Sequence, residues 1–212
     1  MNDYKIPLVN DTISNKELFD LADWIKTIPR LTKGELNNKF EKKWSEWMEV
    51  KNSVFVNSGS SANLLMIDVL KESGRLKSNN IIVPAVSWST TVAPVIQLGL
   101  NPILCDADKD NLGLNIEHLE EILSSNEIGA VMIVHVLGVP NHMTEICELC
   151  KKYDVILLED CCESHGSEYK GSKVGTFGLM STFSYFYGHH ISTIEGGMIS
   201  TNDEEMNESL IL

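Results

Sequence analysis

The sequence alternates short apolar segments with longer segments of helical character, and this alternation constrains the fold more than any other feature. The apolar segments predict strands at residues 53–57, 81–84, 102–105, 130–136 and 155–159. Between them, the sequence predicts helices at residues 62–73, 90–98, 116–123 and 143–152. Because strands that alternate with helices form parallel sheets covered on both faces, we predict a three-layer αβα fold with a mostly parallel sheet.

The two ends of the chain depart from this alternation. Residues 15–50 predict helices alone, whereas strands near 182–186 and 197–200 follow one another without a helix between them. We therefore predict two parts, a helical arm over residues 1–50 and one α/β domain over residues 51–212.

The predicted last helix begins near residue 203, and we find no capping signal for it. Its apolar tail, Leu210-Ile211-Leu212, has no later segment to pack against. This ending predicts a domain that is incomplete at its C-terminus and is completed by further residues or by a partner.

Composition excludes several classes of protein. Of the 212 residues, 43% are hydrophobic and 22% are charged, which is typical of a globular protein. The formal net charge of −13 disfavours nucleic acid and anionic membranes as partners. The first residues lack the pattern of a signal peptide and no apolar run reaches transmembrane length, so we expect a cytoplasmic protein. The five cysteines form no secreted framework, and the Cys147/Cys150 pair falls in a helical pattern, so we expect reduced thiols and no metal site.

Ligands of open α/β sheets bind beyond the carboxyl ends of the strands, which makes the residues after each predicted strand candidates for a site. After the first strand, Gly59, Ser60 and Ser61 form a small-residue turn that leads into a helix. Such a turn can bind a phosphate through free backbone amides and hydroxyl groups. The same residues can also be a plain helix N-cap, and the motif alone leaves both interpretations open.

Two further candidates follow buried strands. Asp160 directly follows the apolar strand at 155–159, where a carboxylate could pair with a protonated ring nitrogen or could cap the next turn. Trp88 follows the strand at 81–84, where its indole could stack on an aromatic ring or belong to the core.

The last candidate segment contains Ser184, His189 and His190. Ser184 offers a hydroxyl group for phosphate, and a neutral imidazole can accept and return a proton near pH 7. If the adjacent histidines continue a strand, their side chains point to opposite faces and only one faces the site. The other four histidines (His118, His135, His142 and His165) require no special role.

These motifs, in this order, resemble the DegT/DnrJ/EryC1/StrS family of sugar aminotransferases, which use pyridoxal 5′-phosphate (PLP) and have fold type I. The resemblance runs from about residue 31 to the end of the chain and includes Ser58-Gly59-Ser60-Ser61-Ala62-Asn63, Val83-Pro84-Ala85-Val86-Ser87-Trp88-Ser89, Glu159-Asp160, Val174-Gly175-Thr176-Phe177-Gly178 and Glu195-Gly196-Gly197. It implies that residues 51–212 are a PLP-binding large domain without the small C-terminal domain, and that the protein is a homodimer.

The resemblance also implies roles for the candidate residues. Gly59, Ser60, Ser61 and Ser184 match the positions that bind the cofactor phosphate. Trp88 matches the position that stacks on the cofactor ring, and Asp160 matches the partner of its ring nitrogen. Glu163 falls where family members usually carry Gln, near the ring oxygen. His189 falls on the position of the lysine that binds PLP covalently; the assignment counts from Ser184, and His190 remains the alternative.

Histidine in place of lysine is the mark of the 3-dehydratase branch of the family, which holds PLP or pyridoxamine 5′-phosphate (PMP) noncovalently. By this resemblance, glutamate supplies the amino group and His189 is the base. The chain then removes the 3-hydroxyl group of a nucleotide-linked 4-keto-6-deoxyhexose, for which a GDP-linked sugar is favoured, in the synthesis of deoxysugars for lipopolysaccharide O-antigens. The alternatives are a nucleotide-sugar aminotransferase and a noncatalytic remnant of the fold.

A related branch of 3-dehydratases combines the same histidine with an iron–sulfur cluster, and Cys162 falls on one of its cluster positions. Such clusters need about four thiolates. Cys147 and Cys150 lie on another segment, so we expect no cluster.

Overall fold

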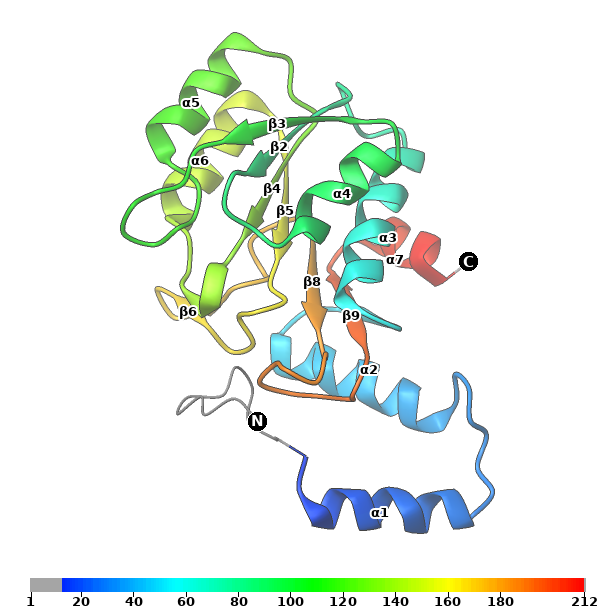
Figure 1. Cartoon of the computed structure of the whole chain (residues 1–212). Helices are drawn as coiled ribbons and strands as arrows, with labels where there is room; N and C mark the ends of the chain where they lie inside the picture. Colours follow the sequence, from blue (N-terminus) through cyan, green and yellow to red (C-terminus); the bar gives the residue numbers. More distant parts are fainter. Residues whose placement is uncertain (1–12, 212) are drawn as a thin grey trace.

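In the computed structural model, which describes residues 13–211, seven strands form one sheet in the order β1-β9-β8-β5-β4-β2-β3 (Figure 1). The strands are β1 (Asn52–Val56), β2 (Asn80–Pro84), β3 (Asn101–Cys105), β4 (Ala130–Val134), β5 (Ile156–Asp160), β8 (Met180–Ser184) and β9 (Gly197–Thr201). Each neighbouring pair from β3 to β8 is parallel, and β9 is antiparallel to both β8 and β1. The prediction of a mostly parallel sheet is therefore confirmed.

Helices cover both faces of this sheet (Figure 1). The helices are α1 (Asn15–Lys26), α2 (Glu35–Met48), α3 (Gly59–Glu72), α4 (Ser89–Gln97), α5 (Ile116–Ser125), α6 (Met143–Tyr153) and α7 (Glu204–Ile211), with a short 3₁₀ helix η1 (Val136–Gly138). Helices α3, α4 and α7 share one hydrophobic cluster with the sheet, and α5 and α6 share another. The three predicted layers are present.

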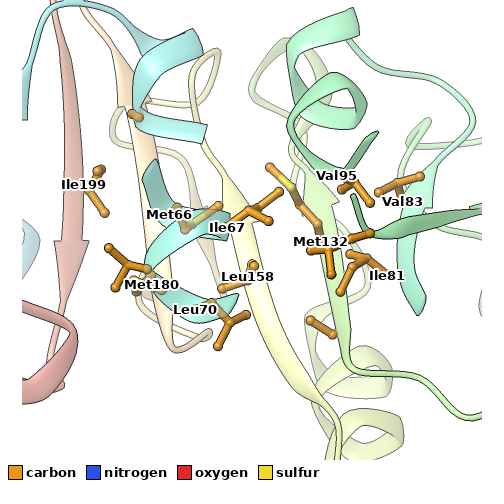
Figure 2. Packing of buried hydrophobic residues seen from close by; sticks show 14 of the residues in the cluster. Met66, Ile67, Leu70, Ile81, Val83, Val95, Met132, Leu158, Met180 and Ile199 are labelled. Carbon is orange, nitrogen blue, oxygen red and sulfur yellow. The ribbon is translucent and has the colours of Figure 1, made fainter. Parts of the chain in front are cut away.

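The side chains of β5 show how one strand serves both cores. Leu158 belongs to the cluster under α3, whereas its neighbour Leu157 belongs to the cluster under α5 and α6. This alternation follows from the two-residue period of a strand. Figure 2 shows Met66 and Leu70 of α3 packed toward Leu158, and both helix residues are almost completely buried. Because α3 directly follows β1 along the chain, its N-terminus lies at the carboxyl edge of the strands.

A third cluster joins α2 to the strands at the end of the sheet. Trp44 and Met48 of α2 are buried against Phe183 and Tyr185 of the segment around β8. Helix α1, in contrast, has no buried residue and lies apart from the sheet in Figure 1. The division of the chain into an arm and a domain at residue 50 stays a prediction, and residues 1–12 lie outside the described part of the chain.

The structure differs from the sequence-based prediction in three places. The predicted strand at 130–136 ends at Val134, because the chain turns into η1. A hairpin of β6 (Glu168–Tyr169) and β7 (Ser172–Lys173) was not predicted; Lys170 and Gly171 between them both have positive φ, as a two-residue hairpin turn requires.

The third difference concerns α7. The expectation of no capping signal is wrong, because Asp203 Oδ1 accepts a hydrogen bond from the Met206 amide at 3.1 Å. Leu210 packs against the core under α3, so part of the apolar tail has a place in the domain, while Leu212 lies outside the described residues. Among the described helices, none is both long and apolar enough to span a membrane.

Candidate active site

The predicted site residues all lie at one edge of the sheet, where parallel strands end. Strand β1 leads into Gly59, β2 leads toward Trp88, β5 ends at Asp160 and β8 ends at Ser184. Because β1, β2, β5 and β8 run in the same direction, their carboxyl ends share this edge. The location agrees with the general position of ligand sites in open α/β sheets.

Gly59 lets the first turn of α3 approach the end of β8 closely. A Cβ atom built on Gly59 would lie 2.6 Å from Ser184 Cβ and 2.8 Å from Cys162 Sγ, distances that Cβ atoms do not adopt. The N-cap is Ser58, whose side chain accepts the Ser61 amide at 3.1 Å. Glycine is therefore needed for packing at this position, independently of any ligand.

The first turn of α3 also has the donors of an anion site. The amides of Gly59 and Ser60 make no hydrogen bond to any residue that the structure describes. Ser60 is exposed, and the hydroxyl group of Ser61, which accepts from Ser58 Oγ at 3.1 Å, is free to donate. The buried Ser184 hydroxyl lies beside this turn. Free amides at a helix N-terminus bind phosphate well, so the N-cap and phosphate interpretations of this turn are compatible.

Asp160 is a buried carboxylate surrounded by hydrogen-bond donors. Its Oδ2 accepts from Asn63 Nδ2 and from Thr91 Oγ1, each at 2.8 Å, and its Oδ1 accepts from the Cys162 amide at 3.1 Å. Only the bond from the Cys162 amide corresponds to the predicted cap of the next turn. An ionised carboxylate has about four acceptor sites, so one acceptor position, on Oδ1, is left for a further donor. A protonated ring nitrogen is such a donor.

Trp88 is not a core residue, since 72% of it is exposed. It is the N-cap of α4, and its carbonyl oxygen accepts from the Thr91 amide at 3.0 Å. Thr91 in turn bonds to Asp160, which ties the start of α4 to the end of β5. The indole ring is thus exposed, as stacking on a bound ring would require, and it lies three residues before Thr91, which bonds to the carboxylate.

The two histidines do not lie on a strand, so the alternation of a strand does not decide which of them faces the site. Strand β8 ends at Ser184, and the chain turns back so that the His189 amide donates to the carbonyl oxygen of Phe186 at 2.9 Å. His189 is half-buried and His190 is exposed. Their burial therefore distinguishes the two residues. Burial lowers the pKa of His189, while the carboxylates of Glu163 and Asp160 act in the opposite direction.

Glu163 bonds to the backbone of η1. Its Oε2 accepts from the Leu137 amide at 2.8 Å, and Leu137 has a positive φ of 52°. This bond holds Glu163 in the loop after β5, where its charge acts on His189. The Glu163 carboxylate therefore raises the pKa of the His189 imidazole, whereas burial lowers it.

Cys105, Cys150 and Cys161 are buried, and Cys147 and Cys162 are half-buried. Burial raises the pKa of Cys162 well above its usual value, and it raises that of Cys150 to about 12. Cys147 and Cys150 both lie on α6, as the helical pattern predicted. His135, Glu159 and Cys161 bring three possible ligand atoms within 4.8 Å of one another.

Hydrogen bonds already use the carboxylate of that buried group. Glu159 Oε1 accepts from the amides of Phe177 and Gly178, and Oε2 accepts from that of Gly175, all at 2.7 Å. His135 Nε2 lies 3.2 Å from Glu159 Oε2. These contacts give Glu159 the role of fixing the loop after β7.

Sequence reasoning did not assign roles to Asn63, Thr91, Thr182 and Glu159. Asn63 was noticed only as part of a motif, although it is a polar residue in the otherwise apolar stripe of α3 with Ala62 and Met66. A polar residue in such a stripe needs a buried partner, and this was the available signal.

We expect Gly59→Ala to lower the free energy of unfolding by about 1–3 kcal/mol, because the added methyl group overlaps Ser184 and Cys162. Urea unfolding followed by circular dichroism measures the change. Ser60→Ala, at the next and exposed position, is the control and should change stability by less than about 0.5 kcal/mol. Equal stability of the Gly59→Ala and wild-type proteins would contradict the packing described for this turn.

His165 gives a prediction on pH. Its ring packs 5.7 Å from that of Trp44 and 5.5 Å from that of Tyr185, and burial lowers its pKa to about 4. The unfolded chain then binds the proton more readily than the folded chain. The stability that the neutral ring contributes is complete above about pH 6.5 and is lost as the pH falls toward 4.

Between pH 7 and pH 5, the wild-type protein should therefore lose about 2 kcal/mol more unfolding free energy than His165→Phe, which keeps a ring but cannot titrate. Urea unfolding at the two pH values measures the difference. Parallel losses in both proteins would show that His165 is not held neutral by its surroundings.

Comparison with known proteins places this geometry in a family. The model of the DegT/DnrJ/EryC1/StrS aminotransferase family matches residues 12–212. A GDP-4-keto-6-deoxy-D-mannose 3-dehydratase from Yersinia pseudotuberculosis is 41% identical over 208 residues, which are 97% of this chain and 52% of that protein.

Solved structures agree with this result. A GDP-4-keto-6-deoxy-D-mannose-3-dehydratase from E. coli with bound hydrated PLP has a TM-score of 0.88 and 41% identity, over 97% of this chain and 53% of that chain. A GDP-4-keto-6-deoxymannose-3-dehydratase with a trapped PLP-glutamate geminal diamine has a TM-score of 0.88 and 40% identity, over 98% and 54% of the two chains. The predicted fold class is confirmed, and the chain spans about half the length of the relatives it matches. By its sequence and its fold, the chain belongs to the DegT/DnrJ/EryC1/StrS aminotransferase family.

Proposed function

We propose that the protein is a 3-dehydratase that uses PLP and PMP to deoxygenate a nucleotide-linked 4-keto-6-deoxyhexose, with glutamate as the amino donor. The observation that carries this proposal is His189, half-buried in the loop that follows β8, in a sequence with no lysine or arginine after Lys173. The relatives at about 40% identity that bear the 3-dehydratase name support the same reaction.

The donors and acceptors of the site fit a PLP molecule. The amides of Gly59 and Ser60, with the hydroxyl groups of Ser61 and Ser184, would hold the phosphate group. Trp88 would cover one face of the ring, and Glu163 would lie near the ring oxygen. The free acceptor position of Asp160 would receive the ring nitrogen and favour its protonated form. When bound, PLP supplies the electron sink that stabilises a carbanion.

His189 is suited to act as the general base of the reaction. Burial lowers its pKa, so a large share of the imidazole is neutral at physiological pH and can accept a proton on a ring nitrogen and return it. The carboxylates of Glu163 and Asp160 stabilise the imidazolium that forms. A lysine at this position would compete as an amine, whereas an imidazole serves only as a base.

The overall reaction balances without a further reductant. Glutamate is oxidised to 2-oxoglutarate and ammonia, and its two electrons reduce C3 of the sugar as the hydroxyl group leaves and a hydrogen replaces it. The product is the 3-deoxy-4-keto sugar. No iron–sulfur cluster is required for this balance.

We further propose a homodimer as the working form and a GDP-linked hexose as the substrate. The printed names of the relatives support the GDP-linked sugar. Recognition of the nucleotide and the hexose is proposed for the whole protein, since this chain spans about half of its relatives. We place the reaction in the cytoplasm, in keeping with five cysteines that are all unpaired.

The test is a mass-spectrometric assay of the chain with PLP, glutamate and GDP-4-keto-6-deoxymannose. We expect the 3-deoxy product together with 2-oxoglutarate and ammonia. His189→Asn should lower its rate of formation by at least about 100-fold, because a positioned base contributes 10²–10⁴. His190→Asn, at the exposed neighbour, is the matched control and should stay within about threefold of wild type.

Two results would contradict the proposal. An amino sugar as the product would identify a transaminase. Full activity of His189→Asn, together with loss of activity in His190→Asn, would move the base to the neighbouring residue.

A further inference from the structure

Asn63 is a fully buried amide whose polar atoms are all bonded. Its Nδ2 donates to Asp160 Oδ2 at 2.8 Å and to the carbonyl oxygen of Thr90 at 3.2 Å. Its Oδ1 accepts from the hydroxyl group of Thr182 at 2.6 Å. Because a carboxylate and a carbonyl group both require a donor, the nitrogen must face Asp160, and Thr182 holds the amide in that orientation.

The sheet register produces this arrangement. Asp160 of β5 and Thr182 of β8 are paired residues on adjacent parallel strands, so their side chains emerge side by side on the same face. Helix α3 lies over β8 and brings Asn63 to both of them. Thr91, in the first turn of α4, supplies the second donor to Asp160 Oδ2. Two strands and two helices thus meet at one carboxylate.

The two donors occupy the acceptor positions of Oδ2. The remaining free position is on Oδ1, which bonds to the Cys162 amide. Free rotation of the Asp160 side chain would exchange the two oxygens and would leave the free position undefined. Donors attached to three separate elements prevent that exchange.

We propose that Asn63 is a positioning residue that acts through Asp160: held by Thr182, it fixes the carboxylate so that Oδ1 alone is offered to the ring nitrogen of the cofactor. This inference rests on the proposed function, because it assumes that Asp160 meets a protonated ring nitrogen. Thr91 restrains the same carboxylate through its hydroxyl group. Its backbone amide also donates a hydrogen bond to the carbonyl oxygen of Trp88, which links the position of Trp88 to that of Asp160.

The alternative is that these residues only fill space in the core, and the two threonines distinguish the cases. Thr→Val keeps the shape of the side chain and removes the hydroxyl group, whereas Thr→Ser keeps the hydroxyl group and removes a methyl group. If the hydroxyl groups position Asp160, Thr182→Val and Thr91→Val should each weaken PLP binding by about tenfold, and the Ser variants should stay within about threefold. If the threonines only fill space, the Ser variants should weaken PLP binding more than the Val variants.

The measurement is a titration of the purified chain with PLP, followed by the absorption band of the bound cofactor and by quenching of tryptophan fluorescence. The band reports the electronic state of the bound ring, to which the ionisation of the ring nitrogen and of the ring oxygen contributes. Thr201→Val is the control, since Thr201 is equally buried but bonds to the carbonyl oxygen of Leu179, away from Asp160. It should leave the dissociation constant within about twofold of wild type.

Asn63 itself is tested by Asn63→Asp, which has the same shape but brings a second carboxylate against Asp160. Two carboxylates at that distance share a proton, so this variant should show the largest loss of PLP affinity, about 100-fold, and a shifted absorption band. In an Asn63→Ala background, Thr182→Val should have less than a twofold further effect, because Thr182 acts through Asn63.

The outcomes separate the two proposals. If wild type binds PLP and the Val variants bind it equally well with an unchanged band, Asn63 is not a positioning residue and the proposed function stands. Independent effects of Asn63→Ala and Thr182→Val would also overturn the inference. If the wild-type chain does not bind PLP at all, the proposed function fails, and the inference fails with it.

Discussion

Two consecutive buried carboxylates at the end of β5, Glu159 and Asp160, are the constraint on which the site depends. Because side chains of a strand alternate, the two point to opposite faces of the sheet. Burial of a charge is costly unless hydrogen bonds compensate it, so each carboxylate must gather donors from the surrounding elements. Asp160 gathers them from α3, α4 and its own loop, and Glu159 from three amides after β7. The carboxyl edge of the sheet is organised around these bonds.

This organisation explains why a fold built from a simple alternation can hold a specific site. Helix α3 is anchored to the sheet by its apolar stripe, and Gly59 lets its first turn come close to Ser184. The free amides of that turn and the free acceptor of Asp160 then lie at the same edge. One end of a cofactor can be held by its phosphate group and the other by its ring nitrogen, with no covalent bond to the chain. Under the proposed function, a base that is not an amine is then sufficient at position 189.

Most of the fold could be predicted from the sequence, because short apolar runs and helical periods are local signals. The candidate residues could also be located, since each follows a strand whose end is visible in the sequence. The hydrogen-bond network around Asp160 could not be found in this way. Asn63, Thr91 and Thr182 are far apart in the sequence, and their meeting depends on the register of β5 with β8, which no local pattern defines. The difference between His189 and His190 also depends on the turn after β8, which lies beyond the strand predicted near 182–186.

The central claim is that this chain holds PLP noncovalently at the edge defined by Asp160 and Gly59. The most direct measurement is to saturate the chain with an equal amount of PLP, confirm binding by the absorption spectrum, treat it with borohydride and determine the intact mass. The account predicts that PLP binds and that the mass of the chain is unchanged, because position 189 is a histidine and the sequence given has no lysine after Lys173. A mass increase located on a lysine would contradict it.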